Sequence, residues 1–199
     1  MPPVAAYHVI ITAYGFWLPN DPRGSWSDFV RSWEIFQHGP ATKTTQRRSL
    51  ARDHHNIPRR LAAKRALAHS PVHFTGPQAR ALARGFAICV NRTHCPIHAA
   101  SIMPTHAHLI LGRQSYPVEQ TINLLKGAAT AQLTRETLHP FQNTPYKNGT
   151  LHTPWARGHW KVFLTTPNDI TRAIQYVENN PLKDGFAPQS WSFIHHHHA

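Results

Sequence analysis

Clustered hydrophobic positions predict four β-strands along the chain. Residues 7–14 (YHVIITAY) are rich in β-branched and aromatic side chains, which is typical of a buried strand. Short apolar segments of similar character recur three times in the second half of the sequence. The strands expected there are 97–103, 106–111 (HAHLIL) and 160–164 (WKVFL).

Apolar residues at helical spacing lie between and after these strands. Thr75 is an expected N-cap, and residues 79–90 repeat small and large apolar side chains at intervals of three and four. A long amphipathic segment at 118–138 and a shorter one at 168–179 predict two further helices. We expect Pro181 to end the last helix, because proline cannot donate a backbone hydrogen bond.

The predicted order is strand, helix, strand, strand, helix, strand, helix, once a long irregular insertion after the first strand is set aside. This is the split βαβ, or ferredoxin-like, pattern with an extra C-terminal helix, so we predict an α+β fold with an antiparallel sheet. The insertion covers about residues 25–73, with one helix expected near 57–68. We predict a single domain over 1–194 and regard the histidine-rich end, 195–199, as a tail or tag remnant.

The charge balance narrows the class of partner. Lys and Arg number 21 against 9 Asp and Glu, a formal charge of +12 over 199 residues, and the insertion alone contains nine of the bases and three of the acids. Such a surplus favours a polyanion, with nucleic acid the first candidate. No apolar run approaches the roughly 18 residues of a membrane span, so no membrane partner is expected.

Two histidines in the third predicted strand form the first candidate site. Side chains two apart in a strand point to the same face, so His106 and His108 are expected side by side, with Ala107 in the core. Two imidazoles at that separation suit one divalent metal ion. The sequence contains 17 histidines, so a pair at this spacing also arises by chance.

The second candidate site lies in the last predicted helix. Tyr176 and Asn180 are four residues apart and therefore share a helix face, while Ile174 and Val177 can anchor the helix. A hydroxyl and an amide oxygen would then point in the same direction. The alternative is a half-buried tyrosine with an asparagine that caps the helix before Pro181.

Together these segments resemble a known family. MPTHAHLIL (103–111) matches the His–hydrophobic–His strand of the HUH single-strand nucleases, and YVENNPLKDG (176–185) matches the tyrosine helix of single-tyrosine transposases. The chain is most similar to REP-associated tyrosine transposases and their insertion-sequence relatives. WARGHWKVF (155–163) and YHVIITAYGFWLPNDPRG (7–24) extend the resemblance, and the insertion is its least diagnostic part.

The resemblance implies a role for each residue. Tyr176 stands where the family has its nucleophile, His106 and His108 where it has two metal ligands, and Asn180 where it has the third. Two imidazoles and an amide oxygen suit Mg²⁺ or Mn²⁺ better than a closed zinc site. The implied activity is cleavage and rejoining of single-stranded DNA through a 5′-phosphotyrosine, and the implied location is the prokaryotic cytoplasm, on the nucleoid. The sequence leaves open a monomer or a homodimer, because relatives of this type include dimers in which the tyrosine helix acts in the site of the partner.

Three further residues are candidate DNA contacts: Arg23 in the PNDPRG loop, Lys126 in the long helix and Lys161 in the last strand. For Arg23 the alternative is a brace of its loop, and for the lysines it is a solvated surface position. Two other functions also remain open, namely a domesticated hairpin-binding protein that does not cleave and a ferredoxin-like RNA-binding domain. An RNA module of this fold presents aromatic side chains on its sheet, whereas here the third strand presents histidines.

Overall fold

The computed structural model describes residues 3–46 and 50–195 and divides the chain into two compact units. One unit combines Met1–Ala13 with His73–Ala199, and the other spans Tyr14–Val72. The second unit therefore includes the Gly- and Pro-rich loop as well as the predicted insertion. Arg47 and Arg48 of the insertion, and the histidine-rich end from 196 onward, lie outside the described residues.

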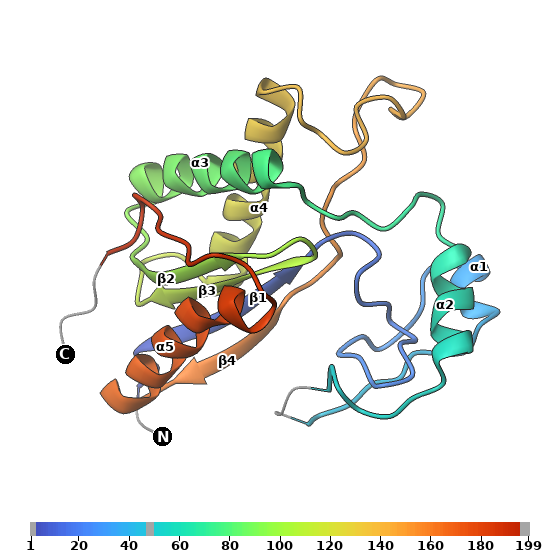
Figure 1. Cartoon of the computed structure of the whole chain (residues 1–199), viewed down its shortest axis with the longest axis horizontal. Coiled ribbons are helices and arrows are strands. Elements are labelled where there is room, and N and C mark those ends of the chain that lie inside the picture. Colours follow the sequence, from blue (N-terminus) through green and yellow to red (C-terminus); the bar gives the residue numbers. More distant parts are fainter. Residues whose placement is uncertain (1–2, 47–49, 196–199) are drawn as a thin grey trace. The chain divides into compact units, whose positions relative to one another are not determined.

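The larger unit is a four-stranded antiparallel sheet with three helices (Figure 1). Its elements are β1 (Ala6–Thr12), α3 (Gly76–Thr93), β2 (Ile97–Ile102), β3 (His106–Gly112), α4 (Val118–Arg135), β4 (Trp160–Leu164) and α5 (Pro167–Lys183). The strand order β2-β3-β1-β4 places β3 between the two strands of a split βαβ unit. This confirms the predicted ferredoxin-like α+β fold.

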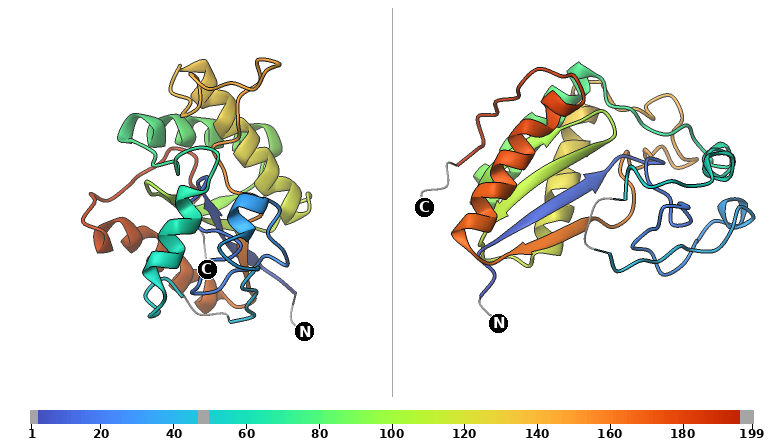
Figure 2. Two further views of the ribbon diagram at one scale, coloured as in Figure 1. Left: turned by 90° about the vertical axis from the view of Figure 1, so that its right-hand side faces the viewer. Right: turned by 60° about the horizontal axis from the view of Figure 1, so that its bottom comes forward.

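Helices cover both faces of the sheet: α3 and α4 lie on one side and α5 on the other (Figures 1 and 2). Because strand side chains alternate, residues paired across the strands in register share a face. Ala6 and Ile110 form a cluster with Ile170 and Val177 of α5. Val9 and its partner Leu109, both fully buried, therefore point the other way, toward α3 and α4.

The helix boundaries follow from local chemistry. Thr75 caps α3 in a reciprocal capping box with Gln78, as the sequence predicts for the N-cap. The helix predicted to end at residue 138 ends at Arg135, because Thr137 adopts a positive φ of 55°. Gly85 is required where α3 passes α4, because a Cβ there would lie 2.5 Å from Cα of Ala129.

The prediction that Pro181 ends the last helix is wrong. Helix α5 continues through Pro181 to Lys183, with Asp184 as its C-cap. An interior proline removes one backbone hydrogen bond and crowds the carbonyl four residues earlier, but Pro181 is buried, so packing stabilises the last turn. Backbone N–H groups of Gly185 and Phe186 then bond carbonyls of that turn. Asn180 therefore lies inside a helix and does not cap its end.

The smaller unit is built mainly from irregular segments. It contains α1 (Trp33–Phe36), a single turn capped by Ser32 that the sequence did not predict, and α2 (Ile57–Arg65), which confirms the helix expected near 57–68. Buried polar groups give its loops their shape, with the Asn20 amide donating to backbone carbonyls of Ile35 and Gly39. Across the described ranges of both units, no helix is long and apolar enough to span a bilayer.

Candidate active site

The histidine pair lies on the sheet face that α5 covers. In β3 the ring centroids of His106 and His108 are 4.8 Å apart, and Ala107 between them is buried in the opposite direction. The two imidazoles are thus side by side, as the spacing predicted. The His106 Nδ1 lies 3.0 Å from the hydroxyl of Thr105, the residue directly before β3, and this contact orients the first ring.

A third histidine, which sequence reasoning missed, joins this pair from the neighbouring strand. His8 of β1 is 9% exposed, and its Nε2 lies 2.9 Å from Nδ1 of His108. Its partner in register is Ile110, which places it on the α5 face. The available signal was a histidine within the largely apolar segment 7–14, at even spacing from Ala6 and Ile10 on that same face.

Tyr176 meets these histidines from α5. Its ring centroid is 5.7 Å from those of both His8 and His108, and the residue is 42% exposed. The ammonium of Lys183, two turns later on the helix, lies 4.3 Å from the centre of the Tyr176 ring. One chain therefore brings the tyrosine, the histidines and a cation together without a second subunit.

Asn180 lies one turn beyond Tyr176 and is only 8% exposed. Its amide nitrogen is buried without a hydrogen-bond partner, a costly state for a polar group. Neighbours of Asn180 on α5 are close enough to affect the strand histidines, because the charge of Asp184 acts on His106 and that of Lys183 on His108. The last turns of α5 thus face the histidine pair.

Burial keeps the histidines of this site neutral. Desolvation lowers the pKa of His8 and of His106 to about 4, although Asp184 opposes the shift at His106. The pKa of His108 also lies well below its ordinary value, mainly through burial and then through the neighbouring histidines and Lys183. Neutral imidazole is the form that binds a metal ion.

The residues present fit a cation held by mixed nitrogen and oxygen donors. Within residues 3–46 and 50–195, no group of three or more His, Cys, Asp or Glu side chains is arranged to hold a metal ion. A metal site that used His106 and His108 would therefore need a ligand of another residue type. The residue available on α5 is Asn180, which is 8% exposed and could offer its amide oxygen, whereas the atom without a partner is its amide nitrogen, which cannot ligate a cation. This set suits Mg²⁺ or Mn²⁺ better than a closed zinc site.

The three predicted DNA contacts are held by other protein groups. Arg23 donates from Nε and Nη2 to the Asp21 carboxylate, both at 2.8 Å, and its guanidinium stacks 3.9 Å above Trp17. Lys126 bonds the carbonyls of Ala156 and Gly158, and burial lowers its pKa to about 8. Both side chains therefore connect segments of the protein. For Arg23 this agrees with the alternative given above, in which it stabilises its own loop.

Lys161 of β4 pairs with Glu119 of α4 at the protein surface. The Lys161 side chain is 27% exposed, so solvent reaches part of it. DNA binding by Lys161, like that by Arg23 and Lys126, stays a prediction.

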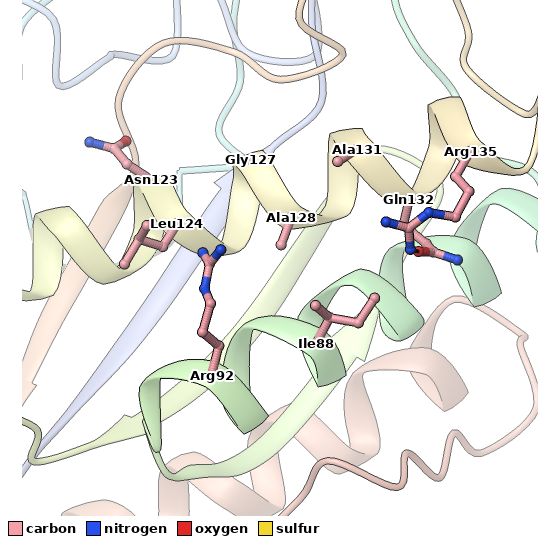
Figure 3. A pocket seen from close by; sticks show the side chains of 9 residues that line it. All are labelled: Ile88, Arg92, Asn123, Leu124, Gly127, Ala128, Ala131, Gln132 and Arg135. Carbon is pink, nitrogen blue, oxygen red and sulfur yellow. Dashed lines mark hydrogen bonds between the residues drawn. The ribbon is translucent and has the colours of Figure 1, made fainter.

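A shallow pocket lies elsewhere, between α3 and α4 (Figure 3). Ile88 and Arg92 line it from α3, and Asn123, Gly127 and Gln132 are among its residues from α4. Because these helices cover the other face of the sheet, the pocket is separate from the histidines.

Comparison with known proteins finds similarity in structure but not in sequence. No protein-family model and no curated protein matches the chain. A REP-associated tyrosine transposase bound to a REP hairpin is 12% identical, with a TM-score of 0.49 over 97% of this chain and 78% of that one. A chain from Deinococcus radiodurans R1, provisionally assigned as a transposase, is 14% identical, with a TM-score of 0.42 over 90% and 92%.

Proposed function

We propose that this protein is a metal-dependent single-strand DNA endonuclease and strand transferase of the tyrosine-transposase type. The observation that supports this most is the position of Tyr176, whose ring lies 5.7 Å from that of His108 on a buried, histidine-lined face. Tyrosine is a nucleophile that forms a covalent link to phosphorus, and the strand histidines with Asn180 form a donor set for a divalent cation.

In this proposal the chain itself performs most of the positioning. His106, His108 and Asn180 would hold Mg²⁺ or Mn²⁺, and the bound ion would supply Lewis-acid polarisation of the scissile phosphate. A phenol with a pKa near 10 needs help to attack at neutral pH. The charged group beside this phenol is the Lys183 ammonium, 4.3 Å from the centre of the Tyr176 ring.

The reaction then conserves the energy of the broken bond. The Tyr176 oxygen forms a bond to phosphorus as the bond to the 3′ oxygen breaks, so the 5′-phosphate stays on the protein and a 3′-hydroxyl leaves. Attack by a 3′-hydroxyl on the phosphotyrosine reverses the step and rejoins DNA without ATP. Since one chain supplies all these residues, the chemistry needs no partner subunit.

The proposed substrate is single-stranded DNA with a hairpin, and the formal charge of +12 favours such a polyanion. An RNA-binding role is less favoured, because helices cover both faces of the sheet and the α5 face presents His8 and His108 beside Tyr176. The proposed location, on the nucleoid in a prokaryotic cytoplasm, follows from this substrate.

Adduct formation tests the proposal. The full chain is incubated with Mn²⁺ and a pool of hairpin oligonucleotides that carry randomised single-stranded flanks and a 3′ label. We expect the label to move with the protein on denaturing gels, because the downstream fragment becomes attached through its 5′-phosphate. Tyr176→Phe should abolish the adduct, whereas Tyr146→Phe, at an exposed position outside the site, should keep it.

Two results would contradict the proposal. An adduct that persists in Tyr176→Phe would show that Tyr176 is not the nucleophile. Hairpin binding without any adduct, with either Mg²⁺ or Mn²⁺ present, would show that the protein binds DNA and does not cleave it.

A further inference from the structure

His8 is a buried polar residue to which the proposed chemistry gives no direct part. It lies on β1 beneath α5, and its ring is surrounded by those of His108, Trp160 and Tyr176, with centroid distances of 5.2, 5.7 and 5.7 Å. Phenylalanine would satisfy these ring contacts equally well. A histidine differs in one respect, the hydrogen bond between its Nε2 and Nδ1 of His108.

That hydrogen bond has two possible proton arrangements, and they differ in their consequence for His108. If His8 donates, Nδ1 of His108 accepts, and the single proton of the neutral His108 ring lies on Nε2. If His8 accepts, the proton lies on Nδ1 of His108, and Nε2 keeps a free electron pair. Only the second arrangement allows His108 to bind a cation through Nε2, because a ligating nitrogen must be unprotonated.

We propose that His8 is a positioning residue that holds His108 in its metal-binding tautomer by accepting a hydrogen bond from Nδ1. The proposal rests on the function proposed above, since it assumes that His108 is a metal ligand. Histidine ligands are commonly oriented by an acceptor on their other ring nitrogen, and that acceptor is usually a carboxylate, a carbonyl or water. Here the chain uses a second imidazole.

The surroundings explain why an imidazole acts as the acceptor. A carboxylate at this position would place a negative charge in a site from which water is largely removed, at a high desolvation cost. His8 is 9% exposed, and its Nε2 lies 2.9 Å from Nδ1 of His108, which is the distance of a hydrogen bond that it can accept. The Thr105 hydroxyl has the equivalent position at His106, 3.0 Å from its Nδ1. Each strand histidine thus has a protein group on Nδ1.

Binding of Mn²⁺ to the full chain without DNA tests this role. We compare wild type with His8→Phe, which keeps an aromatic ring but cannot accept, and with His8→Gln, whose side-chain oxygen can reach a place close to that of Nε2. We expect His8→Phe to weaken Mn²⁺ binding about 10- to 100-fold and His8→Gln to restore most of it. Tyr7→Phe, the neighbouring position on the opposite sheet face, should bind as wild type does.

The tautomer can also be observed in the unaltered protein. With Mg²⁺ bound, two-bond ¹H–¹⁵N spectra should place the His108 proton on Nδ1. This measurement decides the question even if His8→Phe fails to fold.

The outcomes separate the two proposals. A His108 proton on Nε2 with Mg²⁺ bound, or a folded His8→Phe with wild-type Mn²⁺ affinity, overturns the role of His8 alone. A wild-type chain that does not bind Mn²⁺, or a His106→Ala variant that binds it equally well, overturns the metal site and the role of His8 with it.

Discussion

The two faces of the sheet use the same strands for different purposes. Toward α3 and α4, strands β1 and β3 present apolar side chains such as Val9 and Leu109, both fully buried. Toward α5, the same two strands present His8, His106 and His108 among small apolar residues. Alternation with a period of two allows one strand to contribute to a hydrophobic core and to a polar site at once.

The comparison shows where the fold gains stability and where it loses some. Apolar side chains on the α3/α4 face gain free energy simply by leaving water. On the α5 face, the imidazoles of His8 and His108 and the Asn180 amide are buried at a cost that hydrogen bonds only partly offset. Unfavourable burial of this kind is typical of sites that bind or react. Neighbouring residues on opposite faces should therefore respond to substitution in different ways.

His108→Ala should have the largest effect, and the effect should be on chemistry. It removes one of two imidazole donors, so we expect Mn²⁺ binding and adduct formation to fall by at least about 100-fold. Titration calorimetry and the labelled-oligonucleotide assay measure the two losses. Unchanged Mn²⁺ affinity would show that the α5 face is not a metal site.

Leu109→Ala, one residue further along the strand, should chiefly affect stability. Its side chain is fully buried on the α3/α4 face, and truncation of such a leucine costs about 2–5 kcal/mol of unfolding free energy. Urea denaturation measures this loss. Metal affinity of the folded fraction should stay at the wild-type level, and a loss comparable to that of His108→Ala would contradict the division between faces.

Gly85 of α3 and Gly127 of α4 are a matched pair of helical glycines, one at the contact between the two helices and one with open space around it. Gly85→Ala places a methyl group 2.5 Å from Cα of Ala129, so α3 and α4 must move apart, at about 1–3 kcal/mol. Gly127→Ala in α4 meets nothing within 4 Å and should stabilise the helix by about 0.5–1 kcal/mol. Opposite shifts of the denaturation midpoint are expected, and shifts of the same sign would contradict the close helix approach.

Acid should destabilise the protein through the α5 face. The pKa of His8 is about 4 in the folded chain and about 6.5 when unfolded, so between these values the unfolded state binds a proton that the folded state does not. The contribution of neutral His8 to the free energy of unfolding is present above pH 6.5 and is lost progressively as the pH falls toward 4. We expect a loss of about 1–2 kcal/mol from this residue at pH 5. His8→Phe should show a smaller difference between denaturation at pH 7 and at pH 5.

Several features could be predicted from the sequence because they depend on nearby residues. The strand 160–164 and the capped start of α3 follow from β-propensity and from a Thr–Gln pair three residues apart. The shared face of His106 and His108 follows from strand geometry alone. The end of α5 could not be predicted, because burial of Pro181 extends the helix beyond the point where its local preference would end it.

The residues of the candidate site also fall into those that the sequence indicated and those that only the structure revealed. Tyr176 and Asn180 could be singled out as a pair four residues apart, and the family resemblance gave them roles. His8 was missed because its significance depends on His108, a residue 100 positions away in the chain. Lys183 was missed as well, since only the extended helix brings its ammonium over the Tyr176 ring.

By itself the sequence determined the order of strands and helices, the ferredoxin-like class and the residue types available for chemistry. These properties follow from periodicity, capping and composition, which act over a few residues. Only the tertiary structure decided which side chains meet, because strand pairing places β1 beside β3 and helix packing places α5 over both. The hydrogen bond between His8 and His108, and the desolvation that keeps both neutral, exist only after that packing is complete.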